Sequence, residues 1–195
     1  MPTTLKTDRL LLRHWRDDDR MPFAAMNADP RVMEHFPGPL SRPESDALID
    51  EFERRFDPRG FGLWALERRD DGTFIGFTGL AAVPWAALFT PAVEVGWRLA
   101  PDAWGHGYAT EAAREAVRFG FEDAGLDEIV SFTVPANVRS RAVMERLGMT
   151  HDPTDDFDHP RLPEGDPLRR HVLYRLDHES WEAARIRGQV SRSDP

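Results

Sequence analysis

Residues 93–111 read VEVGWRLAPDAWGHGYATE and carry the signals that decide the fold. From Val93 to Leu99, bulky apolar residues at the odd positions alternate with Glu, Gly and Arg, which predicts a half-buried β-strand. From Tyr108 on, small residues recur at helical spacing and predict a helix that can lie close against a sheet. The segment is therefore predicted to pass from a strand through a glycine-containing turn into a helix.

Gly105 and Gly107 lie in the turn that joins this strand to this helix. A helix N-terminus after such a turn presents unpaired backbone N–H groups and the positive end of the helix dipole, which together can bind an anion such as a pyrophosphate. The turn is not a Walker P-loop, which needs Gly-Lys-Ser/Thr, and its glycine spacing differs from that of a dinucleotide-binding fingerprint. On the glycines alone, a tight turn without a ligand remains the alternative.

The rest of the chain predicts further strands and helices around this unit. Strands are expected over residues 10–15, 61–66, 74–83, 92–99, 128–134 and 171–176, and helices over 17–27, 41–58, 108–121 and 137–147. Ser41 with Glu44 predicts a helix start, and Asn137 and Gly148 are the expected caps of the last helix. Residues 152–169 are expected to be irregular. We predict one domain over residues 1–185 and a polar tail over 186–195.

The composition narrows the class of protein. The chain has 195 residues, of which 41% are hydrophobic and 30% charged, and its formal net charge is −9. A single domain of this length can bury a sizeable core without disulfides or metal ions. Because nucleic-acid binding draws its affinity from clustered Lys and Arg, the negative charge predicts no direct nucleic-acid partner.

The chain contains no cysteine, which excludes disulfides, thiolate zinc sites, iron–sulfur clusters and a cysteine nucleophile. Charged residues interrupt the only apolar run near the N-terminus, so no secretory signal is predicted. The longest nonpolar stretch, residues 79–89, contains Pro84 and is much shorter than the roughly 20 residues that a membrane span needs. We therefore expect a cytoplasmic protein without a membrane partner.

Four segments carry a family resemblance. They are residues 7–13 (TDRLLLR), 94–97 (EVGW), 104–111 (WGHGYATE) and 137–148 (NVRSRAVMERLG). In order and spacing they resemble the GNAT N-acetyltransferases, and within them the RimJ/RimL-like branch, over residues 5–178. The wider superfamily begins the glycine loop with Arg or Gln and has glycine at its sixth place, whereas Trp104 and Ala109 stand here. Trp at the first place is usual for this branch.

The resemblance implies an α/β (α+β) fold with a single GNAT-type domain. Its mixed, twisted sheet of about six to seven strands would be splayed between the Glu94 strand and the Glu128 strand and flanked by about four helices. Acetyl-CoA would be the acyl donor and would enter this splay. By the resemblance, the donor contacts the backbone of Val95, Trp97 and Leu99, the loop residues Gly105, His106, Gly107, Tyr108 and Ala109, and Asn137.

The resemblance also implies transfer to an amine. Without a cysteine to carry the acyl group, the simplest mechanism is direct attack of a primary amine on the thioester in a ternary complex. Since α-amines and lysine amines have reference pKa values of about 8 and 10.4, a general base is needed near neutral pH. Glu94 is the candidate base, with a solvated carboxylate as the alternative. No tyrosine lies on the 137–147 helix, so Ser140 is the candidate acid, and a serine bonded to the helix backbone is the alternative.

Other residues allow weaker predictions. Glu111 is expected to stabilise the start of its helix. The histidines show no metal-ligand spacing, so we expect no metal ion. The acids of residues 152–169 could form a lid that attracts a cationic amine, or they could simply face solvent. Trp85 and Phe89 could pack in the core, line the acceptor pocket or form a homodimer interface.

The sequence is also compatible with two other functions. The chain could be a catalytically silent module that binds CoA or a partner protein, or it could transfer a larger acyl group such as succinyl. The acceptor, either a protein N-terminus or a small-molecule amine, cannot be read from the sequence.

Overall fold

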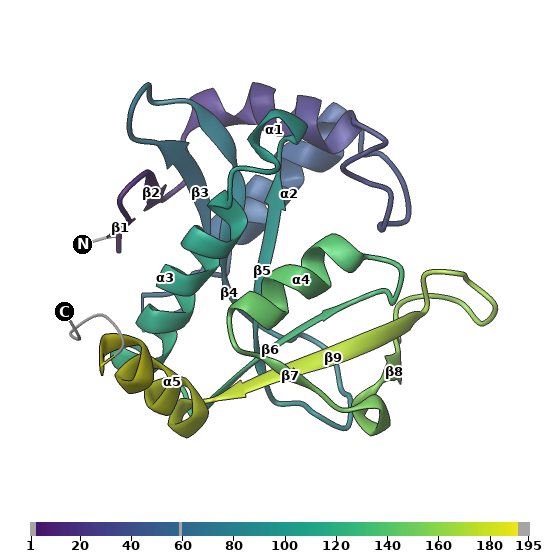
Figure 1. Cartoon of the computed structure of the whole chain (residues 1–195). Coiled ribbons are helices and arrows are strands. Elements are labelled where there is room, and N and C mark those ends of the chain that lie inside the picture. The colour runs from purple at the N-terminus through teal and green to yellow at the C-terminus, as the bar shows by residue number, and fades with distance from the viewer. Residues whose placement is uncertain (1–2, 59, 191–195) are drawn as a thin grey trace.

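The computed structural model of the chain describes residues 3–58 and 60–190 (Figure 1). Its strands are β1 (Leu5–Lys6), β2 (Leu10–Arg13), β3 (Leu63–Arg68), β4 (Phe74–Ala82), β5 (Val93–Leu99), β6 (Glu128–Thr133), β7 (Thr150–His151), β8 (Phe157–Asp158) and β9 (Arg170–Asp177). Its helices are α1 (Arg20–Ala28), α2 (Arg42–Arg54), α3 (Tyr108–Glu122), α4 (Val138–Arg146) and α5 (His178–Val190). No helix in these two ranges is long and apolar enough to cross a membrane.

One mixed sheet organises the molecule, with the strand order β1-β2-β3-β4-β5-β6-β9-β7 and β8 paired to β9. The neighbouring strands are antiparallel except for β5 and β6, which are parallel and share a single paired position, Glu94 with Val130. Beyond that position the two strands diverge, as Figure 1 shows. The predicted fold class, a mixed sheet splayed between these two strands, is confirmed. The short strands β1, β7 and β8 and the helix α5 add to the elements expected.

The helices cover both faces of the sheet. Adjacent residues of β3 point to opposite sides, so Trp64 and Leu66 join the hydrophobic cluster beneath α3, whereas Ala65 joins the cluster beneath α1 and α2. In α3, small side chains such as Ala112, Ala116 and Gly120 are buried against the sheet. A Cβ atom at Gly120 would lie 2.8 Å from Ile129 Cδ1, so glycine is what allows this close approach.

The helix α5 is the element that the sequence analysis missed. Asp177 caps its N-terminus by accepting hydrogen bonds from the Ser180 amide and hydroxyl. Its apolar content is low, and Trp181 is its main packing residue against the core, so the helical periodicity of the sequence is weak. The predicted boundary at residue 185 falls inside this helix, and the end of the predicted tail, residues 191–195, lies outside the described residues.

A buried ion-pair network ties β2 to the start of α1. Arg13, with 5% of its surface exposed, donates two hydrogen bonds of 2.7 and 2.8 Å to the Asp19 carboxylate. Its Nε donates a third, of 2.7 Å, to Glu67 on β3. The buried guanidinium is therefore neutralised by two carboxylates, which offsets the cost of removing its charge from water.

This network predicts a large loss of stability on Asp19→Ala. The free energy of unfolding should fall by roughly 3–5 kcal/mol, because one carboxylate alone would then face a buried cation. Asp18→Ala, at an exposed neighbouring position, is the matched control and should change the free energy by less than about 0.5 kcal/mol. Urea unfolding measures both, and equal effects of the two substitutions would contradict the assignment.

Candidate active site

The backbone of β5 has an open edge where β6 diverges. Val83 donates its amide proton to Ala92, and Ala100 donates to Ile75, so the even-numbered residues of β5 form the hydrogen-bonded pairs with β4. The odd-numbered residues therefore direct their N–H and C=O groups toward β6. Since the strands pair only at Glu94, the backbone of Trp97 faces the gap between them.

The carbonyl oxygens of Val95 and Leu99, on either side of Trp97 along the same strand edge, already accept hydrogen bonds from side chains. The Ser131 hydroxyl donates a hydrogen bond of 2.9 Å to the Val95 carbonyl oxygen, and the Val95 side chain is only 1% exposed. The Trp104 indole donates one of 2.8 Å to the Leu99 carbonyl oxygen. Three β5 residues are expected to contact the donor through their backbone. Of these, Trp97 is the one whose carbonyl oxygen accepts no side-chain hydrogen bond from the described residues.

The glycine turn leads directly into α3. Gly105 and Gly107 have φ angles of +80° and +79°, in the left-handed region that favours glycine. Gly107 is the N-cap of α3, and its carbonyl oxygen accepts the first helical hydrogen bond from the Glu111 amide at 3.0 Å. The amides that precede this bond, those of residues 108–110, have no partner within the helix and form an anion cradle.

Arg9, on the turn before β2, contacts the glycine turn and the first residue of α3. Its guanidinium donates a hydrogen bond of 3.0 Å to the His106 carbonyl oxygen and lies 4.6 Å from the centre of the Tyr108 ring. Glu111 accepts hydrogen bonds from the Arg9 side chain and from the Thr7 hydroxyl at 2.7 and 2.6 Å. Burial alone would raise the pKa of Glu111, but these bonds hold it below the ordinary value. Glu111 thus joins the helix start to the first strands.

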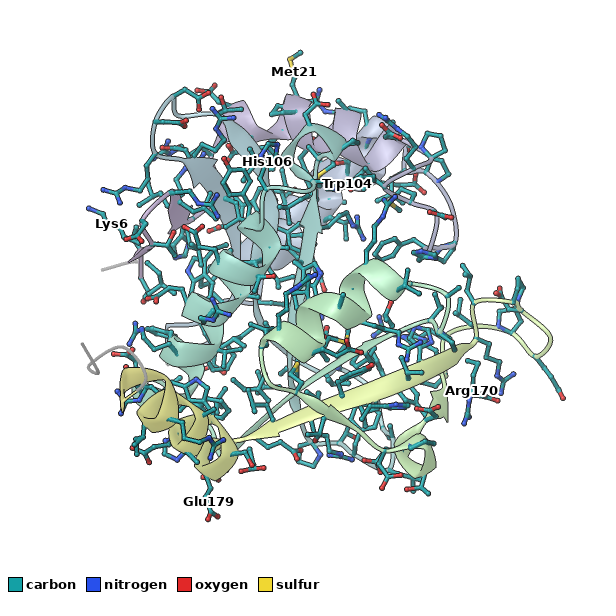
Figure 2. All side chains as sticks on the ribbon, in the orientation of Figure 1. Lys6, Met21, Trp104, His106, Arg170 and Glu179 are labelled. Carbon is teal, nitrogen blue, oxygen red and sulfur yellow. The ribbon has the colours of Figure 1, made fainter. Side chains whose placement is uncertain are left out.

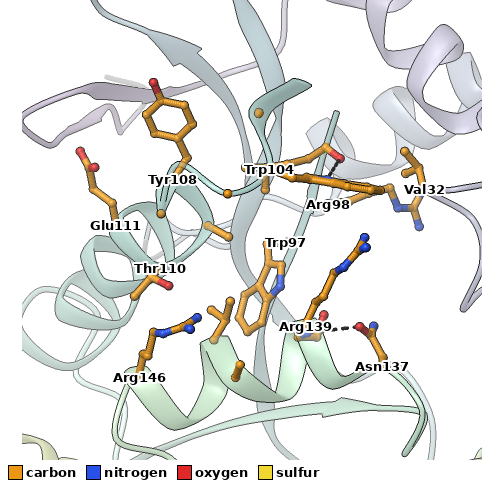
Figure 3. Close-up of a pocket in the computed structure, with 18 of the residues that line it drawn as sticks. Val32, Trp97, Arg98, Trp104, Tyr108, Thr110, Glu111, Asn137, Arg139 and Arg146 are labelled. Atoms are coloured by element: carbon orange, nitrogen blue, oxygen red, sulfur yellow. Dashed lines mark hydrogen bonds between the residues drawn. The ribbon is translucent and has the colours of Figure 1, made fainter. Parts of the chain in front are cut away.

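A cavity of about 1270 Å³ extends from the glycine turn across the splay to the segment between α1 and α2 (Figure 3). In Figure 3, Thr110 and Glu111 lie on one side of Trp97, whereas Val32 and Arg98 lie on the other. Although the chain has a net charge of −9, six arginines line this cavity. They are Arg9, Arg31, Arg98, Arg114, Arg139 and Arg146. The sequence pattern does not reveal this convergence, although Arg139 and Arg146 lie seven residues apart on α4 and so share a helix face.

The helix α4 supplies the opposite wall. The Asn137 side chain caps it by accepting a hydrogen bond of 3.2 Å from the Ser140 amide, and its own amide donates to the Thr133 hydroxyl at 3.0 Å. The Ser140 hydroxyl has no hydrogen-bond partner among residues 3–58 and 60–190, and Ser140 lines the cavity. The local bond expected as the alternative thus involves the Ser140 backbone, and its hydroxyl is available to a ligand.

Glu94 lies at the last paired position before the splay, on the sheet face opposite α3. Its side chain is partly buried, and burial raises its pKa to about 7, against an opposing effect of the Arg161 charge. A carboxylate with a pKa near neutrality can exchange a proton at physiological pH. Glu94 does not itself line the cavity described above.

Most of the predicted site residues meet in this one cavity. Those that line it are Trp97, Leu99, Gly105, Gly107, Tyr108, Ala109, Asn137 and Ser140. Glu94, Val95 and His106 do not. His106 is exposed beside the cradle, and its ring stacks on Tyr108.

Three of the six carboxylates in the acidic segment, residues 152–169, have basic partners among the described residues. Asp155 pairs with Arg175 at 2.6 Å, and Asp156 lies 2.7 Å from a ring nitrogen of His151. Asp158 faces Arg170 at 3.5 Å. Figure 2 shows Arg170 far from Trp104 and His106, so this segment lies away from the glycine turn.

Trp85 and Phe89 pack with other rings. Trp85 lies 5.7 Å from Phe132 on β6, and Phe89 lies 4.9 Å from Phe157 on β8. Among the described residues, no cluster of three or more His, Asp or Glu side chains could hold a metal ion.

Comparison with known proteins identifies the family. The acetyltransferase (GNAT) domain family matches residues 9–150, which include the open strand, the glycine turn and α4. The chain belongs to the GNAT acetyltransferase family. The enzyme class predicted from the sequence, an acetyl-CoA-dependent N-acetyltransferase, is thereby confirmed.

Several relatives are similar in sequence or structure. The FsC-acetyl coenzyme A-N(2)-transacetylase of Aspergillus fumigatus is 39% identical over 63% of this chain, which spans 52% of that relative's length. YkkB of Bacillus subtilis is 31% identical over 78% of this chain and 88% of its own. The crystal structure of an acetyltransferase from Agrobacterium tumefaciens is 32% identical, covers 89% of this chain and 94% of that chain, and has a TM-score of 0.71.

RimJ from Mycobacterium smegmatis, solved with CoA-disulfide, shares the fold. Its TM-score is 0.72 at 19% identity, over 96% of this GNAT chain and 95% of its own.

The cradle predicts a specific effect of Gly107→Val. A side chain here would be strained at φ +79° and would extend from a residue that lines the cavity. The affinity for CoA, measured by calorimetry, should fall by about tenfold or more.

Gly125→Val is the matched control, because Gly125 has a φ of +66° with no heavy atom within 4 Å of an added Cβ and does not line the cavity. Both variants should unfold at lower temperature, but Gly125→Val should bind CoA normally. Equal CoA affinities for the two variants would contradict the prediction that the turn at Gly107 binds CoA.

Proposed function

We propose that this GNAT enzyme transfers the acetyl group of acetyl-CoA directly to a primary amine in a ternary complex. The observation that carries the proposal is the open backbone edge at Trp97 next to the amide cradle of α3. An extended pantetheine arm has amide groups that can pair with such an edge, and a pyrophosphate fits the cradle. The name of the Aspergillus relative, a transacetylase that uses acetyl coenzyme A, supports the same donor and transfer to nitrogen.

The residues available favour direct transfer. With no cysteine in the chain, the amine nitrogen attacks the thioester carbonyl carbon, the new C–N bond forms and the C–S bond breaks. The amine must lose a proton, and the departing thiolate takes one up. Two side chains of this protein can serve these transfers.

Glu94 is the proposed base. Its raised pKa, about 7, leaves it able to accept a proton at neutral pH and to release it afterwards. Because Glu94 does not line the main cavity, we propose that the proton reaches it through one water molecule. Ser140 is the proposed donor to the leaving thiolate, since it lines the cavity and its hydroxyl is uncommitted.

A thiol-release assay tests the proposal. Acetyl-CoA and succinyl-CoA are each incubated with N-terminal peptides, polyamines, amino acids and aminoglycosides. Release of CoA that depends on both acetyl-CoA and one class of amine is the expected result. Faster release from succinyl-CoA would assign a larger acyl donor. CoA binding without release from any pair would favour a silent binding module.

Glu94→Gln should lower kcat by about 10² to 10⁴ at neutral pH, because it removes the base while keeping the size of the side chain. Wild-type kcat/KM should rise with pH through about 7, the pKa of Glu94, and this inflection should be absent in the variant. Part of the lost rate should return as the pH approaches the pKa of the amine. An unchanged kcat with a raised acceptor KM would instead make Glu94 a binding group for the amine.

Glu94 should also make the stability depend on pH. Its carboxyl ionises at about 4.5 in the unfolded chain and at about 7 in the folded one, so the folded state binds the proton more tightly. The stability that this proton contributes is therefore present at pH 4.5 and lost as the pH rises to 7. The melting temperature of Glu94→Gln should match that of the wild type near pH 5 and exceed it at pH 8. A constant difference between pH 5 and 8 would show that Glu94 is solvated.

A further inference from the structure

Arg98 on β5 is a cation that forms no ion pair with any residue the structure describes. Its guanidinium donates a hydrogen bond of 2.7 Å to the Asn27 side-chain oxygen and lies 4.1 Å from the centre of the Phe36 ring. Its Nε is shielded from solvent and has no hydrogen-bond partner within residues 3–58 and 60–190. Asn27 is fully buried and is held in turn by its own hydrogen bond to the Ser45 hydroxyl at 2.8 Å. The position of Arg98 is therefore fixed by neutral groups alone.

The buried Arg13 is a useful comparison, because it is a structural cation whose charge is neutralised by carboxylates of the same chain. Arg13 has two carboxylate partners, Asp19 and Glu67, whereas Arg98 forms no ion pair within the described ranges. The carboxylates that line the same cavity are Asp8, Glu34 and Glu111. None of them pairs with Arg98. Burial lowers the pKa of Arg98 to about 10, so its charge persists at neutral pH and calls for an anion.

Open space adjoins Arg98 on its own face of β5. Glu94, Gly96 and Arg98 alternate on this face, and an added Cβ at Gly96 would meet no heavy atom within 4 Å. Arg98 itself lines the cavity, together with Phe36. The strand therefore leaves open space over Gly96, between the Glu94 carboxylate and the Arg98 guanidinium, and of these three residues only Arg98 lines the cavity. In extended chain the Cα atoms of Glu94 and Arg98 lie about 13 Å apart.

This space lies on the sheet face away from the pyrophosphate cradle. One amide and two rings hold Arg98: the Asn27 amide on α1, the Phe36 ring in the segment after α1, and the Phe77 ring on β4. The cradle amides belong to α3, which covers the opposite face. Since Glu94 shares the face of Arg98, the anion that Arg98 lacks is expected on the side of the amine acceptor.

We propose that the acceptor is an amino acid-type molecule, whose carboxylate is bound by Arg98 while its amine lies over Gly96 toward Glu94. The proposal rests on the acetyltransferase function proposed above and names its substrate class. A planar guanidinium binds carboxylates well, and Arg98 uses its Nη1 for Asn27, while no hydrogen bond of its Nη2 to a residue in the described ranges is found. Arg98 is thus a specificity-determining residue, and the free carboxylates of the acidic segment are not needed to attract the acceptor.

Thiol release with matched acceptor pairs tests the proposal. The probes are L-alanine, β-alanine and 4-aminobutyrate, each beside its primary amide, and rates are compared per unprotonated amine. In the wild type, at least one acid should exceed its amide in kcat/KM by about ten- to a hundredfold, the range expected for a charge-assisted hydrogen bond. Arg98→Met should abolish this preference, and Arg98→Lys should retain part of it.

Three controls separate this role from others. The affinity for acetyl-CoA should not change in Arg98→Met, and a large loss would assign Arg98 to a phosphate of the donor. Arg139→Met, at an arginine of the same cavity on α4, should weaken acetyl-CoA binding while keeping the preference for acids. Arg98→Lys should unfold at nearly the wild-type temperature, because lysine keeps the charge and a donor for Asn27.

The two proposals fail in distinguishable ways. If acids and amides react equally well, or if Arg98→Met slows both equally, the carboxylate site is wrong and the acetyltransferase function stands. If no amine releases thiol, the proposed function fails, and the three acids are then titrated into the protein with CoA by calorimetry. Binding that Arg98→Met abolishes would support the carboxylate site, and no binding to the wild type would overturn it.

Discussion

The divergence of β5 and β6 is the constraint on which the rest of the site depends. Backbone groups inside a sheet must find partners, yet these parallel strands pair only at Glu94 and Val130. The side chains of Ser131 and Trp104 satisfy the carbonyl oxygens on either side, at Val95 and Leu99. In the part of β5 that the structure describes, the backbone edge around Trp97 therefore stays open to a ligand. The sheet thus leaves the backbone N–H and C=O groups of one short stretch of β5 free to pair with an extended ligand.

The charges of the site follow from this geometry. The chain is acidic overall, but arginines from β5, α3, α4 and the segments before β2 and after α1 converge on the cavity. On the α3 side, helix amides and arginines suit the phosphates of a CoA thioester. On the other side, Arg98 and Glu94 stand four residues apart with Gly96 between them. In the proposed site, the same strand therefore separates the residues assigned to the donor from those assigned to the acceptor.

The elements that could be predicted from the sequence are those encoded by short, local sequence patterns. The alternation of β5, the glycine turn and the small residues of α3 are encoded within about 30 residues, and the structure confirmed these elements. The helix α5 was missed because Trp181 is nearly its only anchor. Arg98 contacts Asn27 and Phe36, which are more than 60 residues away in the sequence. The periodicity of apolar residues does not predict contacts between residues so far apart. The arginine lining was missed for the same reason.

Amide hydrogen exchange, followed residue by residue with and without CoA, tests the central claim most directly. If the pantetheine pairs with the open edge, the amides of Trp97 and Leu99 and those of residues 108–110 should become protected together when CoA is added, while amides of α5 should not change. Protection confined to residues 108–110, with the Trp97 amide exchanging as fast as before, would contradict the account, because CoA would then bind without using the splay.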